Sequence, residues 1–105
     1  MLKRASGRDA VKPGAILAVE VGGEQIALYD LDGEVLATSD VCPHAYCLLS
    51  ESADIVNRDQ VECSCHGSRF SIRTGGNLNP PASDPLTTFR TEVREREVFV
   101  DLSSE

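Results

Sequence analysis

The first half of the chain alternates apolar and polar residues in short runs that end at turn-forming pairs. The runs are 14–21, 25–31 and 34–38. A period of two with many β-branched residues is typical of strands. Gly22-Gly23 and Asp32-Gly33 separate the runs, and both pairs tolerate the positive φ of a two-residue hairpin turn. The pattern therefore predicts a three-stranded β-meander.

After Asp40 the alternation stops and returns only in short pieces. Short strands are expected at 60–62, 68–74, 86–94 and 97–102, one helical turn within 50–56, and irregular loops at 42–52 and 77–85. The predicted fold class is all-β, a small antiparallel barrel or sandwich with an inserted subdomain at about 40–85. Every Cys and His lies in this insertion, where the backbone is released from the sheet and function is expected.

The length of 105 residues allows one core, so residues 1–105 are expected to form a single domain. No apolar run reaches the roughly 18–20 residues that a membrane span needs. The basic residues of 1–12 are followed by no apolar stretch, which argues against an export signal. We therefore expect a cytoplasmic protein that does not associate with a membrane.

The net charge of −7 is unevenly distributed. Residues 1–12 carry four basic side chains and one acidic one, whereas residues 13–66 carry one basic and ten acidic ones. An acidic middle segment disfavours binding to the phosphates of nucleic acid. It favours docking on an electropositive protein, where charge tunes the rate and orientation of encounter. A merely solubilising surface is the alternative.

Four cysteines and the only two histidines are concentrated in one short stretch. They are Cys42, Cys47, Cys63, Cys65, His44 and His66. In a chain without a signal segment, a scaffold held by disulfides alone is disfavoured. The cysteine content therefore indicates a metal or redox site.

The spacing of these residues gives two half-motifs, C-x-H and C-x-x-H, separated by eighteen residues. Two loops that each offer a thiolate and an imidazole could hold a metal centre between them. Mixed sulfur and nitrogen ligands suit zinc or an iron–sulfur centre. A single zinc ion held by two cysteines and two histidines is the competing interpretation. Zinc fingers, however, usually begin with two cysteines and end with two histidines, whereas each half-motif here contains both ligand types.

C-x-H and C-x-x-H-G, followed by a Phe, a Thr-Gly and a Pro-rich loop, resemble a Rieske [2Fe–2S] domain. The resemblance covers roughly residues 14–102. It implies one cluster per chain, with Cys42 and Cys63 on the inner iron and His44 and His66 on the outer one. Two neutral imidazoles in place of thiolates make the cluster less negative, which raises its reduction potential.

Further positions take roles from the same resemblance. Ser68 corresponds to a serine whose hydroxyl can bond to cluster sulfur, and Pro81 belongs to a loop that covers the cluster. Phe70 stands where high-potential members carry a tyrosine, so we expect a potential in the lower half of the Rieske range. Family members with two extra cysteines join them, which implies a Cys47–Cys65 disulfide. Two free thiols are the alternative, because cytosol disfavours structural disulfides.

Stand-alone Rieske proteins resemble the ferredoxin components of bacterial aromatic-ring dioxygenases. This implies a monomeric one-electron carrier, not itself an enzyme, in aromatic hydrocarbon catabolism. It would take electrons from an NAD(P)H-dependent ferredoxin reductase and pass them to a terminal oxygenase by transient docking. The alternatives are a Rieske subunit of a larger respiratory or arsenite-oxidase-like complex, and a zinc-stabilised binding module.

Overall fold

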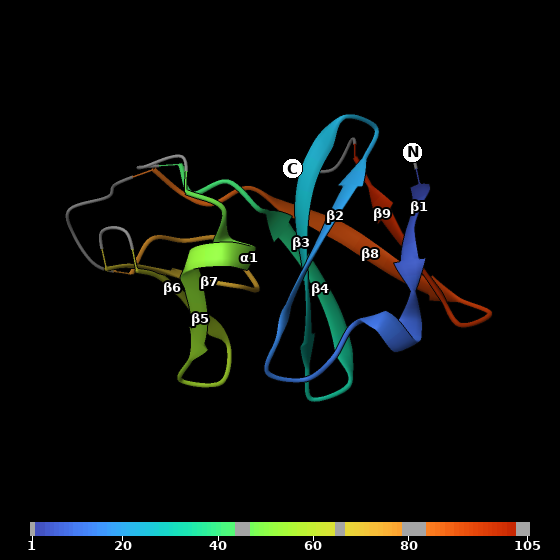
Figure 1. Ribbon diagram of the computed structural model, residues 1–105, viewed down its shortest axis with the longest axis horizontal. Helices are drawn as coiled ribbons and strands as arrows, with labels where there is room; N and C mark the ends of the chain where they lie inside the picture. Colours follow the sequence, from blue (N-terminus) through green and yellow to red (C-terminus); the bar gives the residue numbers. More distant parts are fainter. Residues whose placement is uncertain (1, 44–46, 65–66, 79–83, 103–105) are drawn as a thin grey trace.

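A computed structural model of the chain describes residues 2–43, 47–64, 67–78 and 84–102. Two antiparallel sheets account for most of these residues (Figure 1). The larger sheet has the order β1-β9-β8-β4-β3-β2, and the smaller has the order β5-β6-β7. Their bounds are β1 Leu2–Gly7, β2 Ile16–Val21, β3 Glu24–Leu31, β4 Glu34–Ser39, β5 Ala53–Val56, β6 Gln60–Cys63, β7 Ser68–Ser71, β8 Thr88–Arg94 and β9 Glu97–Asp101.

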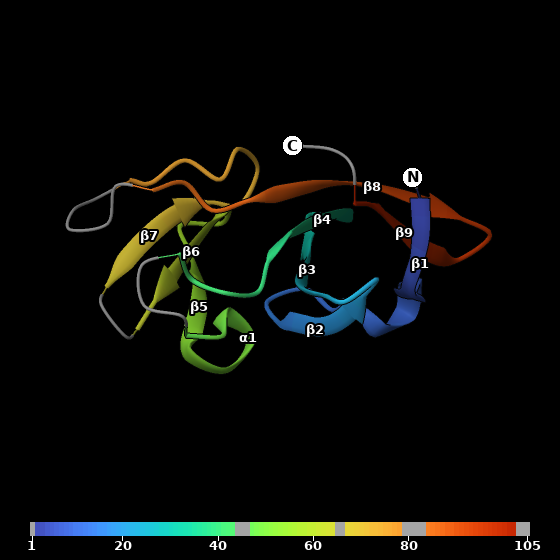
Figure 2. The same cartoon turned by 90° about the horizontal axis from the view of Figure 1, so that it is seen from above.

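The larger sheet is barrel-like, because its two edge strands β1 and β2 contact each other. The smaller sheet lies between β4 and β8 in the sequence and sits beside the barrel along the long axis of the molecule (Figure 2). The all-β fold class is thus confirmed. The boundaries of a single domain with an insertion at about 40–85 stay a prediction.

The predicted meander is present as β2, β3 and β4. Strand β2 pairs with β3 without interruption from Ile16↔Tyr29 to Val21↔Glu24, and β3 pairs in turn with β4. The first turn is a glycine pair with φ of 58° and 85°, and Asp32 in the second turn has φ of 55°. Two successive positive φ values match the twist of the flanking strands, which explains why the two turns set the register.

The N-terminal strand β1 is not predicted by the pattern of residues 1–12. It pairs with β9 at one edge of the sheet, and its side chains are exposed or half-buried. Lys3 and Arg4 occupy positions where apolar residues would have produced an alternation. An edge strand tolerates such charges, which also block pairing with another chain.

The insertion is more regular than predicted. A short helix, α1 (Leu49–Ser52), is followed directly by strand β5, where the pattern indicates only one helical turn. Strand β7 ends at Ser71 instead of residue 74. It ends early because the Ser71 carbonyl accepts the Gly75 N–H in a turn (2.7 Å).

The described residues contain two hydrophobic cores. One fills the barrel around Ile26, Leu28 and Val98. The other lies under the small sheet and contains Cys42 and Cys63. No helix in the described part of the chain is long and apolar enough to cross a membrane.

Candidate metal centre

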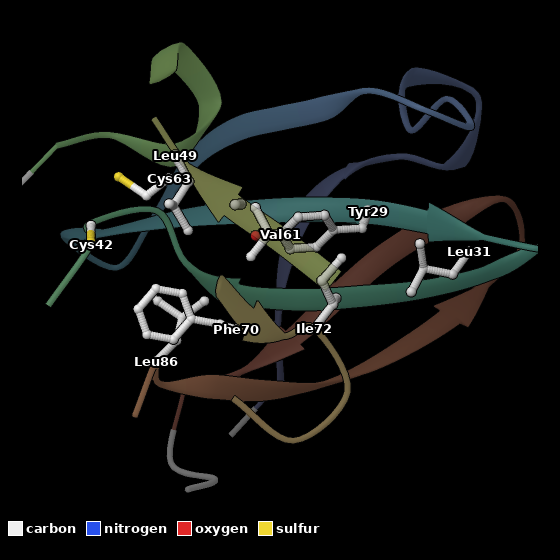
Figure 3. Packing of buried hydrophobic residues seen from close by; sticks show 10 residues of the cluster. Tyr29, Leu31, Cys42, Leu49, Val61, Cys63, Phe70, Ile72 and Leu86 are labelled. Atoms are coloured by element: carbon white, nitrogen blue, oxygen red, sulfur yellow. The ribbon is translucent and has the colours of Figure 1, made fainter. Parts of the chain in front are cut away.

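Two of the predicted ligands, Cys42 and Cys63, are buried together. Both are fully inaccessible to solvent, and neither forms a disulfide. They belong to one core cluster with Leu49, Phe70 and Leu86. Figure 3 shows the two thiols at the same end of this core, beside Leu49. Residues 21 positions apart in the sequence thus reach one point in the fold.

The first ligand loop leaves the end of β4 and returns to α1 through a closed neck. The Cys42 N–H donates to the carbonyl of Cys47 (2.8 Å), and the Leu49 N–H donates to the carbonyl of Asp40 (2.6 Å). These bonds pair the two ends of the loop as short antiparallel strands would. The base of the loop is therefore closed by backbone hydrogen bonds between residues that precede and follow it.

The second ligand loop is the turn of the β6–β7 hairpin. Cys63 and Ser68 face each other in the register, and the Gly67 N–H donates to the Cys63 carbonyl (2.7 Å). Gly67 has φ of +71°, a conformation that glycine adopts without penalty. The Ser64 N–H donates to the Ser52 carbonyl (2.8 Å), so the loop is fastened to the end of α1.

A third loop, the predicted proline loop, is bonded to β7, and the residues that flank it are bonded to each other. The Leu78 N–H donates to the Arg69 carbonyl (2.8 Å), and the Leu86 N–H donates to the Gly75 carbonyl (2.7 Å). Gly75 has φ of +80°, and a Cβ there would lie 2.0 Å from the Leu86 oxygen. Only glycine therefore permits this close approach of the two chain segments.

The fold and the matched sequence identify the family. Residues 3–90 match the Rieske [2Fe-2S] domain. The chain belongs to the Rieske [2Fe–2S] family. Its members hold a [2Fe–2S] cluster with two cysteines on one iron and two histidines on the other, which sets the zinc interpretation aside.

The chain is similar to several ferredoxins, and the similarity extends over nearly the whole length of both proteins. The biphenyl dioxygenase ferredoxin subunit of Pseudomonas sp. (strain KKS102) is 38% identical over 100 residues, which cover 95% of this chain and 91% of that protein. The Sphingomonas yanoikuyae B1 ferredoxin superposes with a TM-score of 0.88 at 28% identity, covering 96% and 98% of the two chains. A chain of the complex of reduced oxygenase and oxidized ferredoxin in carbazole 1,9a-dioxygenase gives a TM-score of 0.83 at 34% identity, covering 94% and 100%.

The described residues fit a Rieske cluster. Two buried, unoxidised thiols are suitable ligands for iron. Beside Cys63, the Ser68 hydroxyl is fully buried, and its oxygen has no hydrogen-bond partner among the described residues. A buried donor without an acceptor is costly and rare. The inorganic sulfur of a cluster would supply that acceptor.

The other predicted site residues fall outside the described part of the chain. They are His44, Cys65, His66 and Pro81. Cys47 is a disulfide-bonded cysteine, unlike Cys42 and Cys63. This agrees with a bridge that ties the ligand loops together. Because Cys65 is outside the described residues, the Cys47–Cys65 pairing stays a prediction.

Two residues at the site are not indicated by any motif. Asp40 is buried, and both of its carboxylate oxygens accept hydrogen bonds from Ser50. They are ten positions apart in a segment without periodicity. An aspartate two residues before a ligand cysteine is the only signal in the sequence, and it does not predict the serine as partner.

Proposed function

We propose that Cys42, His44, Cys63 and His66 hold the cluster and that the chain works as a Rieske ferredoxin. It accepts one electron at a time from an NAD(P)H-dependent ferredoxin reductase. It passes each electron to the terminal oxygenase of an aromatic-ring-hydroxylating dioxygenase system. The observation that carries this proposal is the match to ferredoxin subunits over nearly their whole length.

The residues of the chain supply what an electron carrier needs. When bound, the cluster accepts and releases a single electron without making or breaking bonds to a substrate. Cys42 and Cys63 are inaccessible to water. The hydrophobic residues around them therefore limit the access of solvent to the cluster that they would hold. The Ser68 hydroxyl can donate to cluster sulfur, and such bonds stabilise the reduced form.

The carrier is proposed to be monomeric, cytoplasmic and only transiently docked. A net charge of −7 favours encounter with electropositive surfaces on the reductase and the oxygenase. Electron carriers need fast release as much as fast binding, and small interfaces with low affinity provide both.

Substitution of the two buried ligands tests the ligand set. We expect Cys42→Ser and Cys63→Ser to lose the visible absorption of the cluster and the paramagnetic signal that follows one-electron reduction. Cys47→Ser is the matched control, because it changes a neighbouring cysteine that is not proposed as a ligand. The control should retain both signals and unfold at a lower temperature. A native spectrum in either ligand variant would contradict the assignment.

The histidines are tested by substitutions that convert the ligand type. We expect His44→Cys and His66→Cys either to lose the cluster or to lower its reduction potential, because a thiolate adds negative charge. Unchanged spectra and potentials in both variants would exclude these residues as ligands.

The second candidate is a Rieske subunit of a larger redox complex. It is favoured by two features, the disulfide-bonded Cys47 and the serine at position 68. Phe70, which has no hydroxyl to donate to the cluster, argues against it. A voltammetric titration over pH separates the two. A potential in the lower half of the Rieske range supports the ferredoxin, whereas a high potential that falls steeply with pH supports the subunit.

A further inference from the structure

Asp40 is the residue that closes the first ligand loop with its side chain. It follows β4, precedes Cys42 by two residues and is 2% exposed. Its Oδ1 accepts the backbone N–H of Ser50 (2.7 Å), and its Oδ2 accepts the Ser50 hydroxyl (2.7 Å). Its backbone carbonyl accepts the N–H of Leu49 (2.6 Å). Three hydrogen bonds thus join the residue before the loop to the first turn of α1 after it.

The carboxylate lies close to the ligand. Residues two apart in the chain have Cα atoms at most roughly 7 Å apart, whatever the backbone conformation. Val41, which lies between Asp40 and Cys42, forms an isolated β-bridge with Leu48. Asp40 and Cys42 are buried, whereas Val41 is only half-buried. The carboxylate and the thiol are thus both withdrawn from water, two residues apart in the chain.

The charge of Asp40 is not neutralised by a cation among the described residues. Both carboxylate oxygens accept hydrogen bonds from neutral groups of Ser50. The shallow groove that it lines also carries Glu20 and Glu51, and none of its described lining residues is Lys or Arg. By contrast, buried Asp30 is paired with Arg8 (2.9 Å).

The field of this carboxylate is felt inside the core. Burial is the main cause that raises the pKa of Tyr29, and the negative charge of Asp40 raises it further. Tyr29 and Cys42 belong to the same buried cluster. Cys42 is only two residues from Asp40, so their Cα atoms are at most roughly 7 Å apart and the same charge acts on the ligand.

We propose that Asp40 is a positioning residue that locks the first ligand loop through Ser50 and keeps a fixed negative charge beside Cys42, which lowers the reduction potential of the cluster. The proposal rests on the proposed ligand set. A fixed negative charge disfavours the addition of an electron, and net charge is one of the protein's means of setting a cluster potential.

The first test is Asp40→Asn in the cluster-loaded protein, measured by voltammetry. The amide keeps the shape of the carboxylate and one acceptor oxygen but removes the charge. We expect the native visible spectrum and a reduction potential raised by an amount that corresponds to about a tenfold larger equilibrium constant for reduction, or 59 mV for one electron. Glu51→Gln removes an exposed charge of the same turn and should shift the potential much less.

The second test, Ser50→Ala, is expected to act in the opposite direction. It removes the hydroxyl dipole that offsets the carboxylate charge, so the potential should fall. Because the loop loses a fastening, the Cys42 and Leu49 amides should exchange hydrogen faster. A lowered potential with faster exchange supports the proposal even if Asp40→Asn takes up no cluster. An unchanged or raised potential in Ser50→Ala, or an unchanged one in a loaded Asp40→Asn, overturns it.

These readouts separate the proposal from the ligand assignment. Loss of the ligand set would appear in the visible and paramagnetic spectra of the cysteine variants described above. Failure of the role of Asp40 would appear only as a potential that does not respond, in proteins whose spectra are native.

Discussion

The barrel-like sheet and the ligand-loop region are built by different means. Strand β3 is paired along its length with β2 on one side and β4 on the other. Many similar backbone hydrogen bonds therefore stabilise the sheet together. The loops between β4 and β8 are held by a few single contacts, such as Asp40 with Ser50 and Gly75 with Leu86. One region is stabilised by repetition, and the other depends on individual residues.

This difference separates stability from site geometry. Each ladder bond of the sheet contributes only about 1 kcal/mol net, and the loss of one leaves the register intact. A contact such as Asp40 with Ser50 is not repeated by similar contacts beside it. Its loss therefore changes the positions at which the ligand loop begins and ends. A substitution that removes one hydrogen bond should therefore change the geometry of the ligand loops more than that of the sheet.

The largest difference is expected at Gly75, where the proline loop begins. Gly75→Ala would place a methyl group 2.0 Å from the Leu86 oxygen at a φ of +80°. Left-handed strain and steric overlap together should cost roughly 2–4 kcal/mol of the free energy of unfolding. The cluster should also be lost at a lower denaturant concentration, which visible absorption and circular dichroism would show.

Gly76→Ala is the matched control, because the two glycines are adjacent. The nearest atom to a Cβ at Gly76 is the Thr74 hydroxyl at 3.3 Å, and its φ is not in the left-handed region. It should therefore change the unfolding midpoint only slightly. If the two variants were equally stable, the close approach of Gly75 and Leu86 would not be what fastens the proline loop.

The same contrast explains which parts of the molecule the sequence predicts. The meander follows from alternation and from Gly22-Gly23 and Asp32-Gly33, because all of its determinants are neighbours in the chain. The ligand motif is visible because cysteine and histidine are chemically distinctive at any position. Contacts such as Asp40 with Ser50 depend on where the chain returns, which no local pattern encodes.

The edge strand shows the same limit within the sheet. The pattern does not predict β1, because Lys3 and Arg4 replace an apolar alternation. The strand is fixed instead by pairing with β9 and by the bond from Arg8 to Asp30. Both partners are distant in the sequence, so local alternation does not predict this strand.

A moderate effect is therefore expected from Arg8→Met. Arg8 donates to Asp30 Oδ2 (2.9 Å) and to the Val11 carbonyl (3.1 Å). Loss of hydrogen bonds to a charged, largely buried partner should cost about 1.5–3 kcal/mol in the free energy of unfolding. Arg4→Met is the control. Its bond to Glu97 (2.6 Å) joins two exposed side chains, and such pairs contribute at most about 1 kcal/mol.

The pH dependence of the Arg8 variant gives an independent check. The Arg8 guanidinium, and then the Gly33 N–H, hold the pKa of Asp30 below its ordinary value. A lowered folded-state pKa gives stability that is present above the unfolded pKa of about 3.9 and is lost as the pH falls. The difference in the free energy of unfolding between wild type and Arg8→Met should therefore become smaller at acidic pH. A constant difference from pH 7 to pH 3 would show that charge is not its source.

The smallest effect is expected at Tyr29, which connects the two regions. Its hydroxyl bonds to the Thr38 hydroxyl on β4 (2.8 Å), yet its ring belongs to the core under the ligand loops. Tyr29→Phe should cost about 0.5–1.5 kcal/mol in the free energy of unfolding. The matched variant Thr38→Val removes the other partner, and a double-mutant cycle isolates the coupling between them.

The alkaline behaviour of the Tyr29 variant shows to which region the hydroxyl contributes. Burial raises the pKa of Tyr29 in the folded protein. The contribution of the neutral tyrosine to the free energy of unfolding is therefore fully present below the unfolded pKa of about 10 and is lost as the pH rises further. The free energy of unfolding of the wild type, relative to that of Tyr29→Phe, should fall by up to about 1.4 kcal/mol per pH unit above pH 10. The cluster potential at neutral pH should not change, because the hydroxyl is fastened to a strand of the large sheet. A shifted potential would show that the ladder of β3 and β4 also sets the geometry of the site, and the two regions would then be one mechanical unit.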